Sequence, residues 1–349
     1  MTNASQPLAD ARPPATVTEA VLPGPVEPDG VILRQRPAPQ PSRGQALVRV
    51  EASGVSFAEK AMRRGRYPGQ PKFPFVPGYD LVGRVEAAGP GASSALVGRR
   101  VAALTKVGGW STHAVVDVDD LVPVPDGVSP SAAETVVVNG ITAWQMLHRE
   151  AQVRSGQTIL VHGANGGVGT VLCQLAVHAG VRVIGAASPR HHEALREMGV
   201  EAVDYADVDA LSAEVRRLAP AGVDAVFDNV GGETLQHSWR LLAPGGTLVS
   251  YALAGLMQDP GSLVAHFVAL LVRLAWWNLL PNGRHAVFYD IWSGHRTRPA
   301  RFRRRLKEDL AAVFDLVANG HLTAQVAATF ALTDIAAALT FAESGTVRG

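Results

Sequence analysis

The sequence predicts an α/β protein with two domains, one rich in β-strands and one built on a doubly wound parallel sheet. With 349 residues, the chain is too long for one typical domain. Short strand-like segments punctuated by Gly and Pro run from Ala46 to Ala103, which is typical of a compact β domain. From Thr142 onward strand and helix patterns alternate, which is typical of a parallel sheet.

The N-terminal part is predicted to begin with a disordered tail over residues 1–15. This stretch is rich in Ala, Pro and polar side chains, and it lacks the apolar core of a signal peptide. The strands expected after the tail are Ala46–Glu51, Leu81–Glu86 and Gly98–Ala102.

A glycine-rich turn between a strand and a helix is the most informative segment of the chain. An apolar strand at Ile159–Val161 precedes it, and a helix at Val171–Val177 follows it. The turn contains Ala164, Gly166, Gly167, Val168 and Gly169. Glycines let the backbone approach a dinucleotide pyrophosphate closely, and the N–H groups that begin the helix attract its phosphates. We expect a Rossmann-type cofactor turn in which Ala164 replaces the usual first glycine, with an ordinary glycine turn as the alternative.

The next strand, at Arg182–Ala187, indicates which cofactor is bound. An acidic residue at its end would bind the ribose 2′-hydroxyl of NAD, but no Asp or Glu occurs between Gly169 and Glu193. Ser188 and Arg190 follow the strand instead, and a guanidinium can hold a 2′-phosphate through two hydrogen bonds. The sequence therefore predicts NADPH. The alternative is that Arg190 is a solvated residue at a helix start.

The parallel sheet is expected to continue toward the C-terminus. Its later strands are predicted at Asp224–Asp228 and Thr247–Tyr251, with an edge strand at Ala286–Ile291. A helix ending at Ala318, a strand at Gln325–Phe330 and a helix at Thr333–Glu343 follow.

Composition argues against several classes of function. A net charge of +1 gives no general attraction to nucleic acid or membranes. The single cysteine, Cys173, excludes an internal disulfide and fits a reducing, cytoplasmic compartment. The segment Leu263–Leu280 approaches membrane-spanning length, but His266 and Arg273 interrupt it. We expect a buried or pocket-lining helix there rather than a membrane span.

A series of motifs in a fixed order extends from about Ala46 to the C-terminus. They are Ser56–Glu59, Pro77–Asp80, Val138–Ala143, Ala164–Gly169, Asp204–Tyr205, Asp228–Gly232 and Ala275–Asn278. Through them the chain resembles the zinc-independent quinone oxidoreductase group of the medium-chain dehydrogenase/reductase superfamily. It is similar to the branch that includes the synaptic-vesicle amine-transport-type proteins.

The resemblance implies a GroES-like substrate domain around an inserted NADPH-binding Rossmann domain. The substrate domain would comprise residues 16–140 and 310–349, and the Rossmann domain residues 141–309. The active site would lie in the cleft between the two domains. Pairing of the edge strand near Ala286 across a twofold axis would give a homodimer.

The residue types at the family's ligand positions predict no bound metal. Zinc-dependent members supply a Cys, a His–Glu pair and a further Cys or Asp, together with a separate four-cysteine lobe. In this sequence Ser56 stands at the first position, Tyr79 and Asp80 replace the His–Glu pair, and no cysteine cluster exists. A catalytic zinc takes thiolate or imidazole ligands.

Without a metal, the resemblance implies that NADPH delivers hydride to a conjugated C=C of an enone or enoyl group, or to a quinone. Hydrogen-bond donors would stabilise the enolate that forms. The matching donors are Ser56, Tyr67 and Asn139, although a structural hydroxyl or amide explains each equally well. Some relatives carry a tyrosine near the position of Ala61. By the same mapping, the cofactor would also contact Thr142, Tyr205, Asn229 and Tyr251.

Two classes of function remain open at this stage. One is an NADPH-dependent enoyl or quinone reductase. The other is an NADPH-binding protein with little redox turnover that carries a hydrophobic ligand or partner against Leu263–Leu280. Several hydroxyls expected to face the cleft favour the enzyme, whereas Ala61 in place of tyrosine favours the binding protein.

Overall fold

A computed structural model describes residues 14–251, 263–345 and 347. The chain divides into two compact units. Unit 1 comprises Met1–Val138 and Ala328–Val347, and unit 2 comprises Asn139–Ala327 with the last two residues. The C-terminal segment of unit 1 thus begins at Ala328, beyond the helix that contains residue 310.

Unit 1 is built on an antiparallel five-stranded sheet with the order β6-β3-β4-β5-β7. Its strands are β3 (Gln45–Ala52), β4 (Asp80–Ala88), β5 (Arg100–Leu104), β6 (His113–Asp117) and β7 (Val122–Pro123). A separate antiparallel pair joins β1 (Thr16–Val21) to β2 (Ile32–Pro37). Ala46, Leu47 and Val48 of β3 are all fully buried, and Ala46 and Val48, which share one face of the strand, belong to the core cluster of this sheet.

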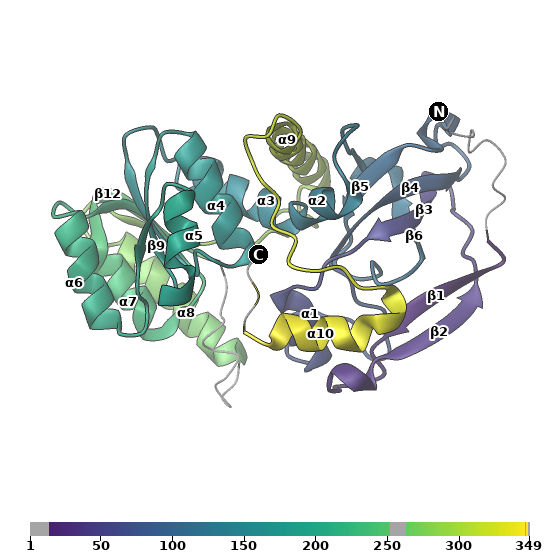
Figure 1. Ribbon diagram of the computed structural model, residues 1–349, viewed down its shortest axis with the longest axis horizontal. Helices are drawn as coiled ribbons and strands as arrows, with labels where there is room; N and C mark the ends of the chain where they lie inside the picture. Colours follow the sequence, from purple (N-terminus) through teal and green to yellow (C-terminus); the bar gives the residue numbers. More distant parts are fainter. Residues whose placement is uncertain (1–13, 252–262, 346, 348–349) are drawn as a thin grey trace. The chain divides into compact units, whose positions relative to one another are not determined.

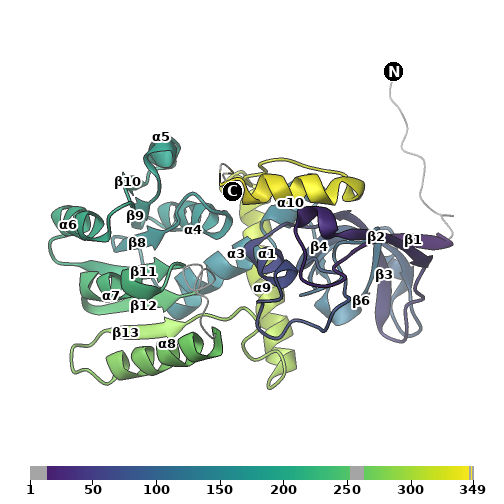
Figure 2. The ribbon, with the colours of Figure 1, turned by 90° about the horizontal axis from the view of Figure 1, so that it is seen from below.

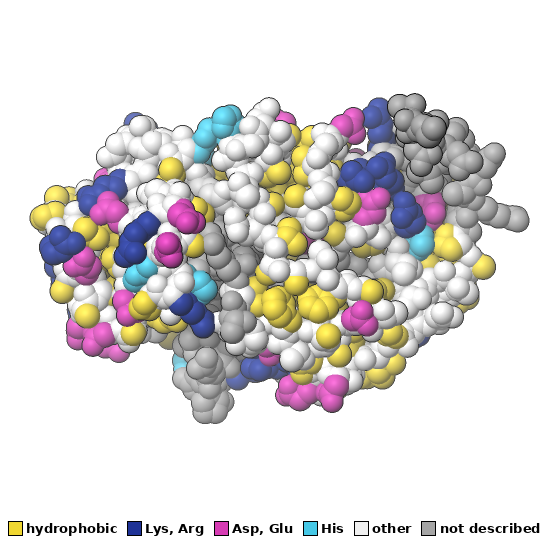
Figure 3. All heavy atoms as spheres, in the orientation of Figure 1, with side chains coloured by type: hydrophobic (Ala, Val, Ile, Leu, Met, Phe, Trp, Pro, Cys, Tyr) yellow, Lys and Arg dark blue, Asp and Glu magenta, His cyan; other side chains and the backbone are white. Residues whose placement is uncertain are grey.

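The helices of unit 1 are α1 (Phe57–Arg63), α2 (Pro130–Thr135) and α10 (Ile335–Glu343). In α10, Ile335 and Leu339 pack in a cluster with Ala20 of β1 and Trp110. Figure 1 shows α10 lying beside α1, and the buried guanidinium of Arg63 joins the two helices by an ion pair of 2.6 Å to Glu343. Hydrophobic side chains gather on the surface over α10 (Figure 3).

Unit 2 contains a parallel six-stranded sheet with the order β10-β9-β8-β11-β12-β13, which can be followed in Figure 2. Its strands are β8 (Thr158–His162), β9 (Arg182–Ala186), β10 (Glu201–Val203), β11 (Val223–Asp228), β12 (Leu242–Ser250) and β13 (His285–Phe288). The direction of winding reverses between β8 and β11, so the predicted doubly wound sheet is confirmed. At this switch point the carboxyl ends of the strands form the usual ligand site.

The helices of unit 2 include α3 (Val138–Trp144), α4 (Gly167–His178), α5 (His192–Glu197), α6 (Val208–Leu218), α7 (Gly232–Leu241), α8 (Leu263–Asn278) and α9 (Pro299–Ala318). A π-helical turn, η4 (Gln145–Glu150), continues α3. Short 3-10 turns occur at η1 (Pro28–Gly30), η2 (Ser94–Leu96), η3 (Val118–Asp120), η5 (Pro189–His191) and η7 (Leu332–Asp334). A cluster of buried side chains joins one face of the sheet to α6, α7 and α8.

Of the two alternatives predicted for Leu263–Leu280, a buried or a pocket-lining helix, the second fits α8: it lines a pocket together with α7 through His266, Ala269, Leu270 and Arg273. Leu270 and Leu274 are buried against the sheet, but Val272 and Trp276 are 64% and 61% exposed. A helix beside the edge strand β13 has a sheet on one side only, and among the residues that the structure describes no element covers its other apolar side. Among the described residues, no helix combines the length and hydropathy needed to cross a bilayer.

The strand predicted at Gln325–Phe330 is wrong. This segment pairs with no strand, and most of its side chains are exposed. Its β-branched and aromatic residues suit a strand, but a strand also needs a neighbour that supplies backbone hydrogen bonds. The edge strand predicted at Ala286–Ile291 is present but shorter, since β13 ends at Phe288.

Candidate cofactor and substrate-side sites

The glycine turn has the backbone geometry that a pyrophosphate cradle needs. Gly163 follows β8 with a φ of +62°, and α4 begins at Gly167. A Cβ on Gly169 would lie 2.1 Å from the carbonyl oxygen of Gly163, so only glycine fits where the helix crosses the turn. Ala164 is fully buried, and its N–H donates to Ala186 of β9 at 3.1 Å. Ala164, which replaces the usual first glycine, therefore joins the turn to the sheet.

The start of α4 offers donors for an anion. Gly166 is the N-cap residue and gives no side-chain cap to the first N–H groups of the helix. Unpaired N–H groups and the helix dipole attract phosphate at such a terminus. Gly167, Val168 and Gly169 supply the first of these groups.

Asn229, just after β11, is a second residue whose surroundings fit a bound cofactor. Its Oδ1 atom is buried and has no hydrogen-bond partner. A Cβ on Gly163 would lie 2.6 Å from Asn229 Nδ2, so the Asn229 side chain packs against the glycine turn. A buried acceptor without a donor costs free energy unless a ligand supplies the donor. The cradle and this atom together fit a dinucleotide at the switch point.

Asn139 of α3 lies against the other side of the same turn. A Cβ on Gly167 would come within 2.7 Å of Asn139 Nδ2. Residues far apart in the sequence thus meet at the cradle, as their assignment to a cofactor site requires.

The positions that follow β9 and β10 are open to solvent. Arg190 is exposed in η5, and its Nε donates to the buried His191 Nε2 at 3.1 Å. Ser188 precedes this turn as its N-cap without a side-chain cap bond. Tyr205, after β10, is 57% exposed. All three side chains can thus be reached by a bound nucleotide.

Thr142 and Tyr251 lie at buried or half-buried positions of unit 2. Thr142, on α3, is 6% exposed. Tyr251 follows β12, and its N–H donates to the carbonyl oxygen of Asp228 at 3.1 Å. Burial raises the pKa of the Tyr251 phenol, and the Asp228 carboxylate raises it further, so the phenol stays protonated at neutral pH.

In unit 1, Ser56 is held by the first turn of α1. It is the N-cap residue of a capping box: its hydroxyl accepts from Ala58 N–H at 3.1 Å and lies 2.5 Å from Glu59 Oε2. The Glu59 carboxyl also accepts from the backbone N–H groups of Ser56 and Tyr79, at 2.9 and 2.7 Å. Ser56 therefore has a structural role beside any chemical one.

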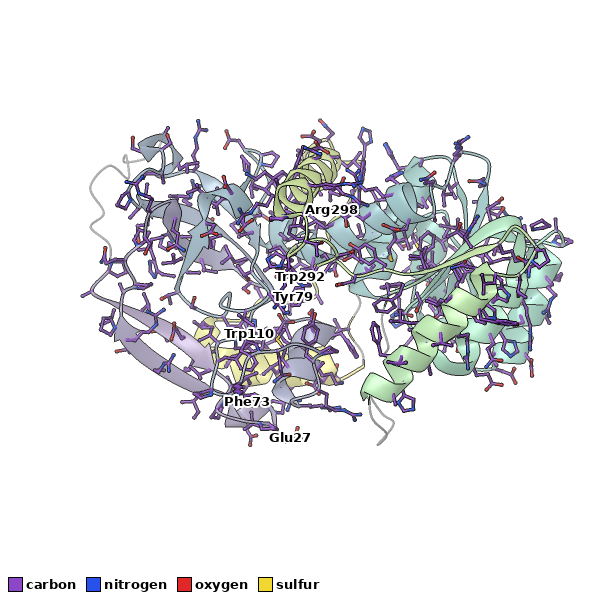
Figure 4. All side chains as sticks on the ribbon, turned by 180° about the vertical axis from the view of Figure 1, so that it is seen from behind. Glu27, Phe73, Tyr79, Trp110, Trp292 and Arg298 are labelled. Carbon is purple, nitrogen blue, oxygen red and sulfur yellow. The ribbon has the colours of Figure 1, made fainter. Side chains whose placement is uncertain are left out.

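The phenol groups of Tyr67 and Tyr79 lie 2.7 Å apart, with their rings edge to face. Tyr79 is buried and Tyr67 half-buried. Figure 4 labels Tyr79 and Trp110 within this unit, where the Trp110 indole donates to the carbonyl oxygen of Gly54 at 2.8 Å. The loop that leads to Ser56 is thereby fixed.

The carboxyl groups of Glu59, Asp80 and Glu134 lie close together, and Glu59 accepts from the backbone N–H of Tyr79. Burial raises the pKa of Glu59, and it raises that of Asp80 to about 7, despite a hydrogen bond from Glu134. Burial and the facing Asp80 hold the pKa of Glu134 well above its ordinary value. Asp80 also accepts from the Val138 N–H at 3.2 Å. Desolvation and the neighbouring carboxyls thus favour the protonated form of each group.

The sequence argument missed this carboxyl group cluster and the Tyr67–Tyr79 contact. The Ser-x-x-Glu spacing at Ser56 and Glu59 is a capping-box signal from which the contact between these two residues could have been predicted. Nothing local in the sequence indicates that Glu134 faces Asp80. No group of three or more potential metal ligands occurs in the part of the chain that the structure describes.

Comparisons with known proteins agree with this architecture. Residues 42–126 match the family model for the alcohol dehydrogenase GroES-like domain, and residues 198–349 match that for zinc-binding dehydrogenases. The mycobacterial protein Rv1454c, solved in complex with NADPH, is 30% identical with a TM-score of 0.80, and the match covers 95% of this chain and 98% of that one. The chain belongs to the medium-chain dehydrogenase/reductase superfamily.

Two curated proteins are also similar to the chain. The rat (Rattus norvegicus) synaptic vesicle membrane protein VAT-1 homolog is 36% identical over 254 residues, which cover 72% of this chain and 61% of the relative. The match thus spans about three fifths of that relative's length. A 2-haloacrylate reductase from Burkholderia is 29% identical over 89% of this chain and 91% of its own.

Proposed function

We propose that the protein is an NADPH-dependent oxidoreductase that reduces a conjugated C=C, in an enone or enoyl group, or a quinone. The observation that carries the proposal is the glycine turn with Asn229 Oδ1 beside it, a buried acceptor that lacks a donor. The NADPH complex of the mycobacterial relative and the reductase activity in the name of the Burkholderia relative support it.

The cofactor would be held by the groups that surround the turn. The N–H groups that begin α4 would bind the pyrophosphate, and Ser188, Arg190 and Tyr205 the adenosine end with its 2′-phosphate. Asn139, Thr142, Asn229 and Tyr251 would contact the nicotinamide end. Bound there, NADPH supplies a hydride.

Ser56 and Tyr67 are the proposed donors to the oxygen on which negative charge develops. Ser56 cannot donate to the substrate oxygen while its hydroxyl proton is donated to an ionised Glu59 carboxylate. The raised pKa of Glu59 offers a solution, because a protonated Glu59 can donate to Ser56 Oγ and leave the serine proton for the substrate. Likewise, Tyr67 can donate when Tyr79 donates to it.

The proposed reaction needs no metal. A conjugated acceptor spreads the arriving charge onto an oxygen that a few donors can stabilise, so a Lewis acid is not required. Ser56, Tyr79 and Asp80 lack the thiolate and imidazole ligands that zinc takes. A stoichiometric zinc in elemental analysis, with turnover lost on chelation, would contradict this part. A homodimer paired through β13 is proposed with it.

A second candidate is an NADPH-binding protein with little turnover. It is favoured by Ser56 and Tyr67, whose hydroxyls both contact other side chains of unit 1, and by the exposed apolar side of α8.

One experiment separates the two candidates. NADPH oxidation is followed spectroscopically with enones, quinones and enoyl thioesters, and deuterium is traced from labelled NADPH. Label at the β-carbon of a reduced enone supports the reductase. Tight NADPH binding without consumption by any conjugated acceptor supports the binding protein, and absence of NADPH binding rules out both.

A further inference from the structure

Three buried polar side chains join the ends of β8 and β11, the neighbouring strands at the switch point of the parallel sheet. His162 is the last residue of β8, Asp228 is the last residue of β11, and Ser238 lies on α7. The Ser238 hydroxyl donates to Asp228 Oδ2 at 2.8 Å, and its Oγ lies 3.0 Å from His162 Nε2. These three residues form the strand-end network.

The hydrogen bonds of the strand-end network run in one direction, from His162 through Ser238 to Asp228. The single hydroxyl hydrogen of Ser238 is used on Asp228, so Ser238 Oγ accepts from the Nε2–H of His162. Burial lowers the pKa of the His162 imidazole, so the ring is neutral and carries one N–H. That N–H is the one directed to Ser238.

The second oxygen of the Asp228 carboxyl group fixes the loop that follows β11. Oδ1 accepts from the backbone N–H groups of Val230 and Gly231, each at 2.8 Å. Gly231 has a φ of +80° and a ψ of −158°, a conformation essentially confined to glycine. Asn229 lies between Asp228 and these two residues, so its backbone is held by the same carboxyl group.

The strand-end network and the cofactor turn close a ring of contacts. His162 directly precedes Gly163 of the turn, Asn229 directly follows Asp228, and the Asn229 side chain packs against Gly163. Asn229 Oδ1, the buried acceptor that lacks a donor, belongs to this ring. Its place beside the turn is therefore fixed both by contact with Gly163 and by the hydrogen bonds of Asp228.

We propose that His162, Ser238 and Asp228 are positioning residues that hold Asn229 Oδ1 beside the cofactor turn, where it accepts a hydrogen bond from a donor group of the bound dinucleotide. The inference rests on the proposed function, since it needs NADPH at the turn. A preorganised acceptor loses less conformational entropy on binding than a mobile one. Part of the affinity for NADPH is then set by side chains that do not touch it.

A double-mutant cycle on NADPH affinity tests the inference. Calorimetric titration is carried out with Ser238→Ala, Asn229→Ala and the double variant. Each single substitution is expected to weaken NADPH binding about 3- to 12-fold, the range for one neutral hydrogen bond. Because Ser238 acts through Asn229, the double variant should bind within about twofold of Asn229→Ala alone. A brace without this role would lower the melting temperature and leave the two effects on affinity independent.

His162 gives a second cycle in case Ser238→Ala does not fold. His162→Leu removes the N–H that Ser238 accepts, so it should weaken NADPH binding in the wild-type background and have no further effect in Asn229→Ala. His162→Gln carries an amide N–H that can donate to Ser238, and it should restore most of the affinity.

Ser212→Ala is the matched control. Ser212 of α6 is as buried as Ser238, donates to the carbonyl oxygen of Val208 at 2.8 Å and contacts His237 Nδ1 at 3.1 Å. Its substitution removes a buried serine–histidine contact away from the cofactor turn, so NADPH affinity should not change.

Two results would overturn the inference: unchanged NADPH affinity in folded Ser238→Ala, or losses that multiply in the double variant. In both cases NADPH binding by the wild type, and with it the proposed function, would stand. If the wild type does not bind NADPH at all, the proposed function fails and the inference fails with it.

Discussion

The side-chain amide of Asn139 occupies the space beside Gly167, where a Cβ would come within 2.7 Å of Asn139 Nδ2. A helix that precedes β8 is thereby joined to the first residue of the helix that follows it. Asn139, a proposed cofactor ligand, thus packs against the cofactor turn. A substitution at this contact can change cofactor binding without preventing folding.

Gly167→Ala is expected to fold normally but to bind NADPH more weakly. The new methyl group meets the flexible end of the Asn139 side chain, which can turn away. Loss of one ligand hydrogen bond predicts a loss of roughly 3- to 12-fold in affinity. Calorimetric titration and thermal unfolding together check this. Gly169→Ala is the contrasting variant, because its methyl group meets the Gly163 backbone at 2.1 Å and should lower the melting temperature. Equal melting temperatures for the two variants would contradict the assignment.

Arg190→Ala is expected to weaken NADPH binding by about 1.5–3 kcal/mol, the range for a hydrogen bond to a charged group. NADH carries no 2′-phosphate, so its affinity should barely change. Arg196→Ala, an exposed residue of the neighbouring helix α5, is the matched control and should change neither affinity. If the wild type binds NADPH and NADH equally well, the assignment of Arg190 is wrong.

The buried carboxyl groups predict that the protein loses stability as the pH rises. The pKa of Asp80 is raised from 3.8 to about 7 in the folded chain, so folded Asp80 binds its proton more tightly than unfolded Asp80. This contribution is complete below about pH 4, declines as the pH rises toward 7, and is lost above that value. Glu59 and Glu134, whose pKa values are also raised, act in the same direction.

The melting temperature should therefore fall between pH 5 and pH 8, and it should fall less in Asp80→Asn, because an amide does not ionise. The Asn side chain can still accept from the Val138 N–H. Asp126→Asn, at an exposed position of the same unit, should keep the wild-type pH dependence. A melting temperature that rises from pH 5 to pH 8 would show that these carboxyls are ionised in the folded protein.

Removal of the proposed oxyanion donors should lower turnover more than binding. Ser56→Ala and Tyr67→Phe should each reduce kcat, by about 100- to 1000-fold for whichever is the main donor. Ser56→Ala also removes a helix cap, at a cost of about 0.5–2 kcal/mol, so its melting temperature must be measured alongside. Ser56→Thr keeps both cap and hydroxyl and should retain most activity.

The hydrogen bond from protonated Glu59 to Ser56 adds a pH signature to this prediction. Wild-type kcat should decrease as the pH rises and Glu59 ionises, whereas Glu59→Gln, whose amide can donate to Ser56 Oγ at every pH, should lose this dependence. An unchanged pH profile in Glu59→Gln would assign Glu59 to capping of α1 alone.

The sequence by itself determined the features that depend on local patterns. Strand and helix periodicity gave the β-rich part and the parallel sheet, and the glycines between Ile159–Val161 and the following helix located the cofactor turn. The residues after β9, with Arg190 and no carboxylate, favoured NADPH. These features can be predicted from the sequence because a turn or a helix start needs particular residue types at fixed short spacing.

Only the tertiary structure decided which distant side chains meet. Gln145 and Asp309 are 164 residues apart, yet Gln145 Nε2 donates to the buried Asp309 carboxylate at 2.7 Å. The exposed side of α8 and the unpaired segment Gln325–Phe330 likewise depend on neighbours, not on their own composition. A side chain's burial, pKa and hydrogen-bond role come from the groups packed around it, and the packing brings those groups from anywhere in the chain.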